Sequence, residues 1–483
     1  MAGETPRLEH VPVAPLPLER FADVLTPEQA EKLDRDAARA RRVLADRVVW
    51  NVNSTARGGG VAEMLTSLIA YTRGSGVDAR WVVIDGDPEF FRITKRIHNR
   101  LHGSAGDGGP LDAREVEVYR RTTQRNQEAL EELARPGDIV LLHDPQTAGL
   151  AGSLVGRGVR VIWRCHVGVD VPNAEAREAW EFLLPFVREA EAYVFSRASF
   201  AWDDLDPERV TVIPPSIDAF APKNQDLDDE TVGAILRCAG IAVGSCPTGA
   251  VFMRQDGSPG RVDRRADLGE SAPLDGSTPY VAQVSRWDRL KDPIGVLDAF
   301  ARGIAPRTSA SLVLAGPAVS AVSDDPEGLE VLNETSARRA ALPAEIRDRV
   351  LLVSLPMDDA AENAAMVNAL QRRAAVVVQK SLAEGFGLTV AEGMWKGRPV
   401  VASRVGGIQD QIQDGVTGVL VDPHDGDAFA DAVARLLEHP DEAVRIGAAA
   451  RDEIRDLFLG PRHLTQYVDL FERLLESGGR RDR

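Results

Sequence analysis

Two glutamates flank a pair of glycines in the stretch from Ser381 to Glu392, and these residue types suit a sugar joined to a phosphate. Glu384 and Glu392 stand eight residues apart, with Gly385 and Gly387 between them. Glycine lets the backbone approach a ligand closely, and the unpaired N–H groups of a helix start favour an anion. Carboxylates are poor phosphate ligands but good acceptors for sugar hydroxyls. The competing interpretation is a glycine-rich turn with two solvated glutamates, and the turn alone does not decide between them.

A strand and a helix position this stretch. The apolar run from Ala374 to Val378 predicts a buried strand just before it. The helix that follows ends near Gly397 and Pro399, which are typical of a helix stop. Ligands of parallel sheets bind at the loops beyond the C-terminal strand ends. We therefore expect both glutamates at a ligand-binding edge.

Two basic residues follow another predicted strand, residues 280–285. Arg286 and Lys291 lie on the loop after this strand, and Pro293 then starts a helix. The planar fork of Arg and the compact charge of Lys would together clamp a diphosphate. Considered alone, two basic residues on a loop are better explained as solvated charges.

Two strand ends in the first half of the chain carry weaker signals. Gly59 and Gly60 belong to the loop 53–61, where the backbone could approach a phosphate or sugar, although a tight turn with positive φ competes with this interpretation. The spacing is not the dinucleotide fingerprint G-x-G-x-x-G. His166 could donate or accept a hydrogen bond near a sugar, but a lone histidine at a strand end is more often structural. His143 has the same ambiguity.

The chain alternates strands and helices, which predicts an α/β fold of two doubly wound parallel-sheet (Rossmann-like) domains. With two such domains, the cleft between them is the expected site. The predicted strands are apolar, β-branched runs at residues 47–53, 81–85, 139–143, 160–166, 192–195, 210–213, 280–285, 311–315, 350–355, 375–379, 400–403 and 419–421.

Composition shifts divide the chain. Residues 1–45 are predicted to form a proline-bearing arm and a charged helix, and residues 46–218 the N-terminal domain, which ends at a stiff double proline. Residues 219–458 form the predicted C-terminal domain, in which 239–278 read as an irregular insertion rich in Gly, Pro, Ser and charge. Residues 459–483 form a last helix, apolar on one face, and a tail.

Charge and cysteine content narrow the class of protein. A net charge of −17, from 57 basic and 74 acidic side chains, argues against a general nucleic-acid or anionic-membrane binder. Three cysteines, an odd number without a framework spacing, favour a reducing cytoplasm over a disulfide scaffold. No run of residues has membrane-spanning length, and no cluster has metal-ligand spacing. We expect a cytoplasmic protein without a metal site.

Taken together, these residues resemble the retaining GT-B nucleotide-sugar glycosyltransferases. The resemblance covers roughly Val48 to Leu475 and rests on the glutamate pair, the Arg286 and Lys291 pair, and the N-terminal glycine loop. A closer resemblance, to the trehalose glycosyltransferring synthases, rests on residues 49–64, 378–397 and 405–408, and trehalose phosphorylases share much of it. The insertion 239–278 is longer than we expect for the synthases.

The resemblance implies a role for each residue of the C-terminal domain's motifs. Glu392 would bind the ribose hydroxyls of the donor nucleotide, and Glu384 the hydroxyls of the donor sugar. Arg286 and Lys291 would neutralise the departing diphosphate, so that no metal is needed. The backbone that holds the donor sugar with Glu384 would be that of Gly385, Phe386, Gly387 and Leu388.

The N-terminal domain would bind the acceptor. Gly59 and Gly60 would let its backbone reach the phosphates and the sugar, and His166 would contact a hydroxyl of the reacting sugar. The attack is expected on the same face as the leaving group, with the leaving phosphate taking the acceptor's proton. Positioning and charge stabilisation would then replace a protein nucleophile.

We therefore predict a hexosyltransferase that moves glucose from a nucleotide-diphosphate glucose, ADP- or UDP-glucose, to glucose and forms trehalose. The donor is a substrate, and no cofactor is expected. One alternative is a trehalose phosphorylase that uses inorganic phosphate, which would leave Glu392 without a ribose. Others are a GT-B enzyme with another small-molecule acceptor and a non-catalytic sugar-nucleotide sensor. We expect small-molecule partners, no nucleic acid or membrane, and a homodimer as one candidate assembly.

Overall fold

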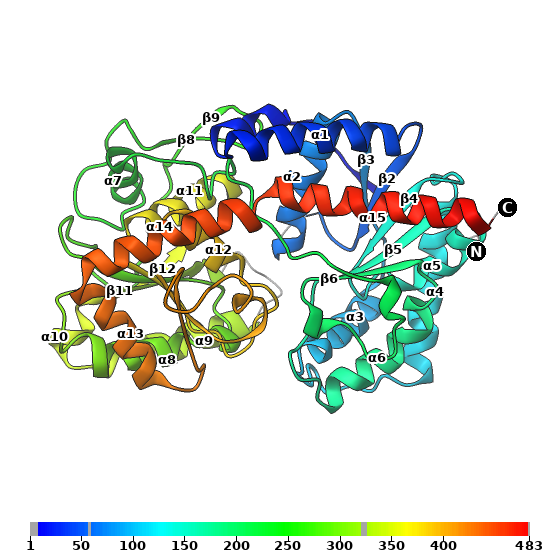
Figure 1. Ribbon diagram of the computed structural model, residues 1–483. Coiled ribbons are helices and arrows are strands. Elements are labelled where there is room, and N and C mark those ends of the chain that lie inside the picture. The colour runs from blue at the N-terminus through cyan, green and yellow to red at the C-terminus, as the bar shows by residue number, and fades with distance from the viewer. Residues whose placement is uncertain (1–7, 57–58, 320–325, 482–483) are drawn as a thin grey trace. The chain divides into compact units, whose positions relative to one another are not determined.

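The computed structural model describes residues 8–56, 59–319 and 326–481 (Figure 1). The chain forms two compact units, one of Met1–Ser216 with Gly460–Arg483 and one of Ile217–Leu459. Each unit is built on its own sheet, so each is described by itself.

The first unit contains a seven-stranded sheet in the order β1-β3-β2-β4-β5-β6-β7. All neighbouring strands are parallel except β1, which pairs antiparallel with β3 at the edge. The strands are β1 (Glu9–Val11), β2 (Val48–Asn53), β3 (Asp78–Val83), β4 (Ile139–His143), β5 (Arg160–Cys165), β6 (Ala192–Phe195) and β7 (Val210–Val212).

Helices cover both faces of this sheet because successive strand residues point to opposite sides. Ile139 and Leu141 of β4 belong to one apolar cluster, and Val140 and Leu142 belong to the other. The helices of this unit are α1 (Pro27–Val43), α2 (Gly59–Gly74), α3 (Pro88–Leu101), α4 (Ala113–Glu131), α5 (Ala151–Gly156), α6 (Ala174–Val187) and α15 (Gly460–Arg481).

The last helix, α15, packs beside α1 at the other end of the sequence, as the red and blue ribbons of Figure 1 show. Val468 and Phe471 of α15 are buried in the same cluster as α1 and α2. At the edge of this contact, the Thr465 hydroxyl donates to Asp36 Oδ2 at 2.8 Å, and Arg39 pairs with Asp469. The apolar face predicted for this helix therefore belongs to the first unit.

The second unit contains a six-stranded, wholly parallel sheet in the order β12-β11-β10-β13-β14-β15. Its strands are β10 (Tyr280–Val284), β11 (Ser311–Pro317), β12 (Val350–Leu355), β13 (Val376–Gln379), β14 (Val400–Ser403) and β15 (Val419–Val421). Its helices are α7 (Asp229–Cys238), α8 (Pro293–Ala299), α9 (Pro326–Ala340), α10 (Ala344–Arg347), α11 (Ala360–Arg373), α12 (Leu388–Trp395), α13 (Gly426–Glu438) and α14 (Pro440–Leu457).

Local chemistry sets where many of these helices begin. Short side-chain oxygens accept hydrogen bonds from otherwise unpaired N–H groups of the first turn. Thr26 caps α1 reciprocally with Gln29. The other α-helices with a side-chain cap of this kind have it on the residue just before the helix: Asp87, Asp112, Asn173, Asp228, Asp292, Asp359 and Asp425.

The segment 239–278, predicted to be an irregular insertion, contains a short hairpin of β8 (Val251–Met253) and β9 (Pro259–Arg261). A disulfide joins Cys238 and Cys246, although the cysteine count had argued against a disulfide scaffold. The hairpin is fixed to the start of α11, where Arg254 forms a bidentate ion pair with Asp359 at 2.7 and 3.1 Å. Three-residue strands are too short to produce a readable period.

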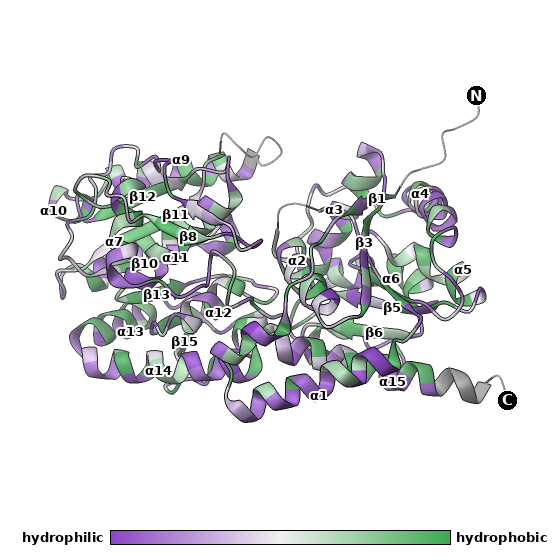
Figure 2. Cartoon of the chain, turned by 90° about the horizontal axis from the view of Figure 1, so that it is seen from above, coloured by the Kyte–Doolittle hydropathy of each residue, from purple (hydrophilic) through white to green (hydrophobic). Residues whose placement is uncertain are grey.

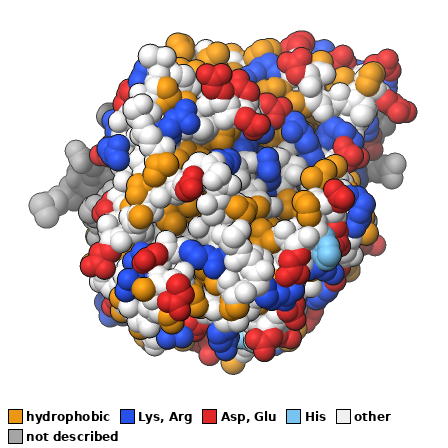
Figure 3. Space-filling model, turned by 90° about the vertical axis from the view of Figure 1, so that its left-hand side faces the viewer, with side chains coloured by type: hydrophobic (Ala, Val, Ile, Leu, Met, Phe, Trp, Pro, Cys, Tyr) orange, Lys and Arg blue, Asp and Glu red, His pale blue; other side chains and the backbone are white. Residues whose placement is uncertain are grey.

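All twelve predicted strands overlap a strand of the structure, and the predicted α/β fold is confirmed. The remaining strands, β1, β8 and β9, are three residues each and were missed. Figure 2 shows the hydrophobic strands between helices of mixed hydropathy, and Figure 3 shows acidic and basic side chains interspersed on one face. Within the described residues, no helix combines the length and the apolar character needed to cross a membrane.

Candidate active site

Lys291 and Glu384 meet at the point where the strand order of the second sheet reverses. Lys291 follows β10 and Glu384 follows β13, and these strands are neighbours in the sheet although β11 and β12 lie between them in sequence. Lys291 Nζ lies 2.5 Å from Glu384 Oε2, and about one seventh of each side chain is exposed, 15% and 14%. The Ser381 hydroxyl also donates to Glu384 Oε2 at 3.2 Å. The two predicted site residues therefore form a charged pair at the edge where ligands of such sheets bind.

Buried polar groups fix the backbone that carries Lys291. The Gln283 side chain donates to the Lys291 carbonyl at 2.8 Å and accepts from Lys380 N–H at 3.2 Å, so it ties the two loops together. Asp292 has a left-handed φ of 47°, which Asp tolerates better than most residues. One of its oxygens caps α8 at Gly295 N–H, and the other pairs with the buried Lys380 ammonium.

A glycine turn holds the loop that contains Glu384. Gly387 stands before α12 with φ 84°, and no side chain caps that helix start. Gly407 N–H donates to Gly385 O at 2.9 Å. A Cβ at Gly406 would lie 1.7 Å from the Glu384 carbonyl oxygen. The glycines of the 405–408 motif therefore allow that loop to pack directly against the Glu384 loop, next to a helix start without a side-chain cap.

Glu392 lies one helical turn into α12 and is almost fully buried. Its Oε1 is 3.5 Å from Lys223 Nζ. Lys396 Nζ donates to the Glu392 carbonyl and to Asn224 Oδ1, both at 3.1 Å, and so fixes the same turn to the segment that contains Lys223. The sequence analysis missed Lys223 because it follows the double proline without any motif.

Arg286 is placed differently from Lys291. Its side chain is 66% exposed and donates to Asp288 Oδ2 at 2.8 Å on its own loop. Arg289, on the same loop, forms a bidentate pair with Glu334 at 2.7 and 2.8 Å. Of the two residues of the predicted clamp, Lys291 therefore contacts Glu384 on the loop after β13. Arg286 instead contacts Asp288 on its own loop.

Gly59 and Gly60 begin α2 in the first unit. Gly59 has a φ of 79° and open space where a side chain would be, so this position combines a left-handed backbone with access for a ligand. Arg57 and Gly58 of the same loop lie outside the described residues.

His166 directly follows β5 and lies in a buried polar cluster. Its backbone N–H donates to Asp144 Oδ1 at 2.8 Å. Its ring Nε2 is 3.1 Å from Nδ1 of His143, the last residue of β4, and His143 Nε2 is 3.2 Å from Asn51 Oδ1 on β2. Arg164, which is fully buried, directs its Nε to the His166 ring. Sequence analysis had treated the two histidines separately, and the structure brings them together.

Burial controls ionisation in this cluster. Desolvation, helped by the nearby Arg164 charge, lowers the pKa of His143 to about 3 and holds the pKa of His166 well below its usual range. Desolvation also raises the pKa of Asp144 to about 7, opposed by the hydrogen bond from His166 N–H. Both imidazoles are therefore neutral at pH 7.

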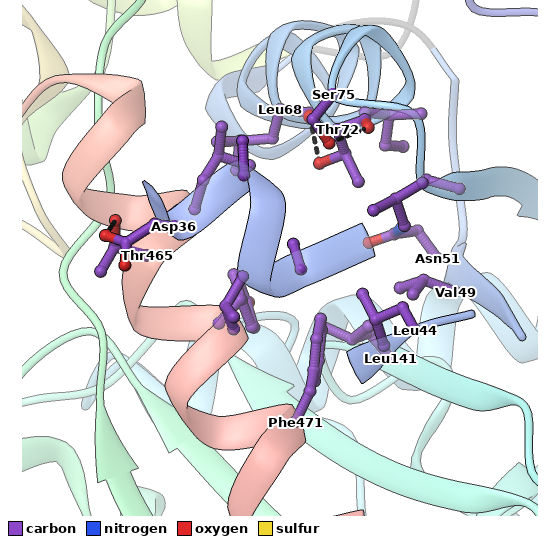
Figure 4. Close-up of a pocket in the computed structure, with 18 of the residues that line it drawn as sticks. Asp36, Leu44, Val49, Asn51, Leu68, Thr72, Ser75, Leu141, Thr465 and Phe471 are labelled. Atoms are coloured by element: carbon purple, nitrogen blue, oxygen red, sulfur yellow. Dashed lines mark hydrogen bonds between the residues drawn. The ribbon is translucent and has the colours of Figure 1, made fainter. Parts of the chain in front are cut away.

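An apolar cavity with about 70 Å³ of space for water lies between α1, α2, α15 and the sheet of the first unit (Figure 4). Asn51 and His143 form part of its wall. Among residues 8–56, 59–319 and 326–481 there is no group of three or more His, Cys, Asp or Glu side chains arranged to hold a metal ion.

Each unit matches a known family. Residues 51–202 match the family described as "Trehalose synthase, N-terminal domain", and residues 265–453 match "Glycosyl transferases group 1". A solved structure of a UDP-forming α,α-trehalose-phosphate synthase from Burkholderia xenovorans, in complex with glucose-6-phosphate, aligns with a TM-score of 0.65 at 17% identity, over 89% of this chain and 100% of that one. The fold and these matches define a GT-B glycosyltransferase.

Two relatives make the family more specific. The chain is 33% identical to the trehalose synthase of Pyrococcus horikoshii over 457 residues, which cover 95% of this chain and 96% of the relative. It is 35% identical to the trehalose synthase of Rubrobacter xylanophilus over 430 residues, covering 88% and 90%. The chain belongs to the trehalose synthase family, and its chemistry is trehalose-related glycosyl transfer, as the sequence predicted.

Replacing Gly406 tests whether the 405–408 motif supports the Glu384 loop. Gly406→Ala should lower the free energy of unfolding by at least about 2 kcal/mol, because its Cβ overlaps the Glu384 carbonyl in a left-handed backbone. Gly415→Ala is the matched control, with φ 76° and open space around the added Cβ, so only about 1 kcal/mol of backbone strain applies. Urea unfolding of both variants gives the comparison, and equal losses would contradict the supporting role.

Proposed function

We propose that this chain transfers glucose from a nucleotide-diphosphate glucose, ADP- or UDP-glucose, to glucose with retention of configuration and so forms trehalose. The observation that carries the proposal is the Lys291–Glu384 pair at the reversal point of the second sheet. A cation and a carboxylate in contact there offer a partner for a diphosphate and one for sugar hydroxyls. The membership of the trehalose synthase family supports the same substrate class.

In the proposed reaction, Lys291 exchanges its partner Glu384 for the diphosphate of the donor. Its diphosphate takes the Lys291 ammonium from Glu384, which frees Glu384 to accept hydrogen bonds from the donor sugar. The bond from C1 to the phosphate oxygen breaks, and the acceptor oxygen bonds to C1 on the same face. The acceptor's proton passes to the departing phosphate oxygen. Stabilising negative charge as it develops is the protein's main contribution, so the proposal needs no metal.

The nucleotide is proposed to lie along α12. The uncapped start of this helix faces a phosphate, and Glu392 accepts hydrogen bonds from the ribose hydroxyls. Lys223, 3.5 Å from Glu392 Oε1, favours the ionised carboxylate that such a contact needs. Gly59, Gly60 and His166 are proposed to contact phosphate and sugar from the first unit, as the family resemblance implies.

A substrate matrix tests the function directly. Purified protein in EDTA is given ADP-, UDP- or GDP-glucose, or glucose 1-phosphate, with glucose, glucose 6-phosphate or fructose as acceptor. The expected result is a non-reducing disaccharide from a nucleotide-glucose and glucose, with both anomeric carbons in the α configuration by NMR. Product from glucose 1-phosphate alone would favour a phosphorylase, and a requirement for added Mg²⁺ would contradict the charge assignment.

Lys291 and its neighbour Arg289 form a matched pair for the second test. Lys291→Ala should remove a contact to the departing diphosphate worth about 2–4 kcal/mol, which lowers kcat/KM roughly 30- to 1000-fold. Arg286→Ala should cost less, since its side chain is largely exposed and already paired. Arg289→Ala removes a cation of the same loop that pairs with Glu334, and its activity should stay within about twofold of wild type. Near-normal kcat/KM in Lys291→Ala would remove Lys291 from the mechanism.

Calorimetry should distinguish the roles of Glu384 and Glu392 in donor binding. Glu392→Ala should weaken binding of the free nucleotide diphosphate and of its glucose conjugate by a similar factor, because both contain the ribose. Glu384→Ala should weaken the conjugate and leave the free nucleotide nearly unchanged, or slightly tighter, since Lys291 loses its competing carboxylate. If Glu392→Ala changes neither affinity, the ribose assignment is wrong and the phosphorylase alternative gains support.

A further inference from the structure

Five side chains of the first unit form one continuous chain of hydrogen bonds, here called the relay. It runs from Tyr467 on α15 through Arg164 and His166 at β5 to His143 on β4 and Asn51 on β2. Arg164 Nη1 donates to the Tyr467 hydroxyl at 2.7 Å, and Arg164 Nε lies 3.3 Å from His166 Nδ1 and 3.1 Å from His166 Nε2. The remaining steps, His166 to His143 and His143 to Asn51, span 3.1 and 3.2 Å.

Donor and acceptor counting gives the relay one direction. A guanidinium can only donate, so the ring nitrogen that it contacts must be unprotonated. If that nitrogen were His166 Nε2, His143 Nδ1–H would have to donate to the same lone pair as the guanidinium, and Asn51 would have to turn its amide nitrogen toward His143 Nε2. If it is His166 Nδ1, every step pairs one donor with one acceptor. His166 Nε2–H then donates to His143, and His143 Nε2–H donates to Asn51 Oδ1.

Arg164 is the fixed end of this relay. Besides the ring and the Tyr467 hydroxyl, its Nη2 donates to the Ile213 carbonyl at 3.1 Å. Within the part of the chain that the structure describes, no carboxylate forms an ion pair with this fully buried guanidinium. Its hydrogen bonds therefore go to three neutral acceptors, and a planar fork is the shape that reaches all three at once. The Arg164 charge also opposes the desolvation that raises the pKa of the buried Asp144 carboxyl.

The opposite end of the relay is less constrained. Asn51 lines the apolar cavity between α1, α2 and α15, and Figure 4 shows it at the cavity wall. A side chain at the edge of empty space gains little packing on that side. The position of the His166 ring is thus set from the Arg164 side, which α15 contacts through Tyr467.

We propose that Arg164 and Tyr467 are positioning residues that hold His166 in one place as its Nε2-protonated form, so that the C-terminal helix controls the histidine assigned to the reacting sugar. This inference rests on the proposed function for the role of His166. With Nδ1 held by Arg164 and Nε2–H held by His143, both ring nitrogens are occupied and the ring cannot flip, so an incoming sugar meets its carbon edge in one fixed orientation.

The first measurement needs no substrate. Long-range ¹H–¹⁵N correlation spectra of ligand-free, histidine-labelled protein, assigned with His143→Gln and His166→Gln, report which nitrogen of each ring carries the proton. Wild type should show Nε2–H for both rings at pH 7. Tyr467→Phe keeps the aromatic ring that stacks on His463 and Phe471 but removes the hydroxyl, and it should give His166 a mixture of protonation forms. An Nδ1–H ring at His166 in wild type, or an unchanged spectrum in Tyr467→Phe, would overturn the proposal.

The second measurement is kinetic. Loss of positioning should lower kcat about 10-fold in Tyr467→Phe and about 10- to 100-fold in Arg164→Lys, with donor KM changed less than about threefold. Arg164→Lys retains the charge without the fork, so recovery of both kcat and the wild-type spectrum by Lys would show that charge alone matters and overturn the proposal. Tyr193→Phe removes another buried tyrosine hydroxyl of the first unit, 3.5 Å from the Arg188 carbonyl, and should leave kcat unchanged.

The two measurements separate this inference from the proposed function. If wild type transfers no glucose from any donor, the proposed function fails, while the spectra of wild type and Tyr467→Phe still decide whether the relay holds the ring. If transfer occurs and Tyr467→Phe keeps wild-type kcat and a wild-type spectrum, the relay fails and the proposed function stands. In each case, thermal unfolding of Tyr467→Phe, compared with that of wild type and Tyr193→Phe, shows whether the variant is folded.

Discussion

The constraint on which the rest of this structure depends is that a parallel sheet must be covered on both faces. Parallel strands need a crossover connection, and right-handed crossovers place helices on each side of the sheet. Every strand then ends at the same edge, so the loops after the strands collect there whatever their separation in sequence. In the second unit this brings Lys291 to Glu384, and in the first unit it brings Asn51, His143 and His166 together. Polar and charged side chains therefore lie close together at this edge, because the loops after all the parallel strands are there.

Much of this was predictable because the relevant signals are local. Buried parallel strands are short apolar runs bounded by turn residues, and the predicted 139–143, 192–195 and 350–355 match β4, β6 and β12 residue for residue. The Glu384 loop and the basic loop with Lys291 were visible because glycines and charges directly follow such runs. A strand end and its chemistry lie within a few residues of each other, so one sequence window contains both.

What could not be predicted depends on contacts between distant segments. Lys223 lies beside Glu392, yet 169 positions separate their numbers and no pattern joins them. Tyr467 was recognised only as part of an apolar helix face, whereas its hydroxyl accepts from the buried Arg164. The 239–278 segment is joined to α7 by the Cys238–Cys246 disulfide, and its hairpin is fixed to α11 by the Arg254–Asp359 ion pair. Such tertiary contacts leave no period in the sequence. Local sequence propensity predicts where helices and strands form, but it does not predict which distant side chains they contact.

The two units hold their polar groups in opposite ways, and the difference fits the two parts of the proposed reaction. Lys291 and Glu384 are oppositely charged, and about one seventh of each side chain is exposed, so a ligand that carries its own charge can replace one partner without leaving the other charge unpaired. The relay is buried, and both its imidazoles are neutral, so opening any one step would leave a buried donor or acceptor unpaired. A departing diphosphate needs partners that rearrange as its charge develops, whereas a sugar must be held in one orientation for attack on a single face. An exchangeable ion pair suits the first requirement, and a neutral relay with fixed direction suits the second.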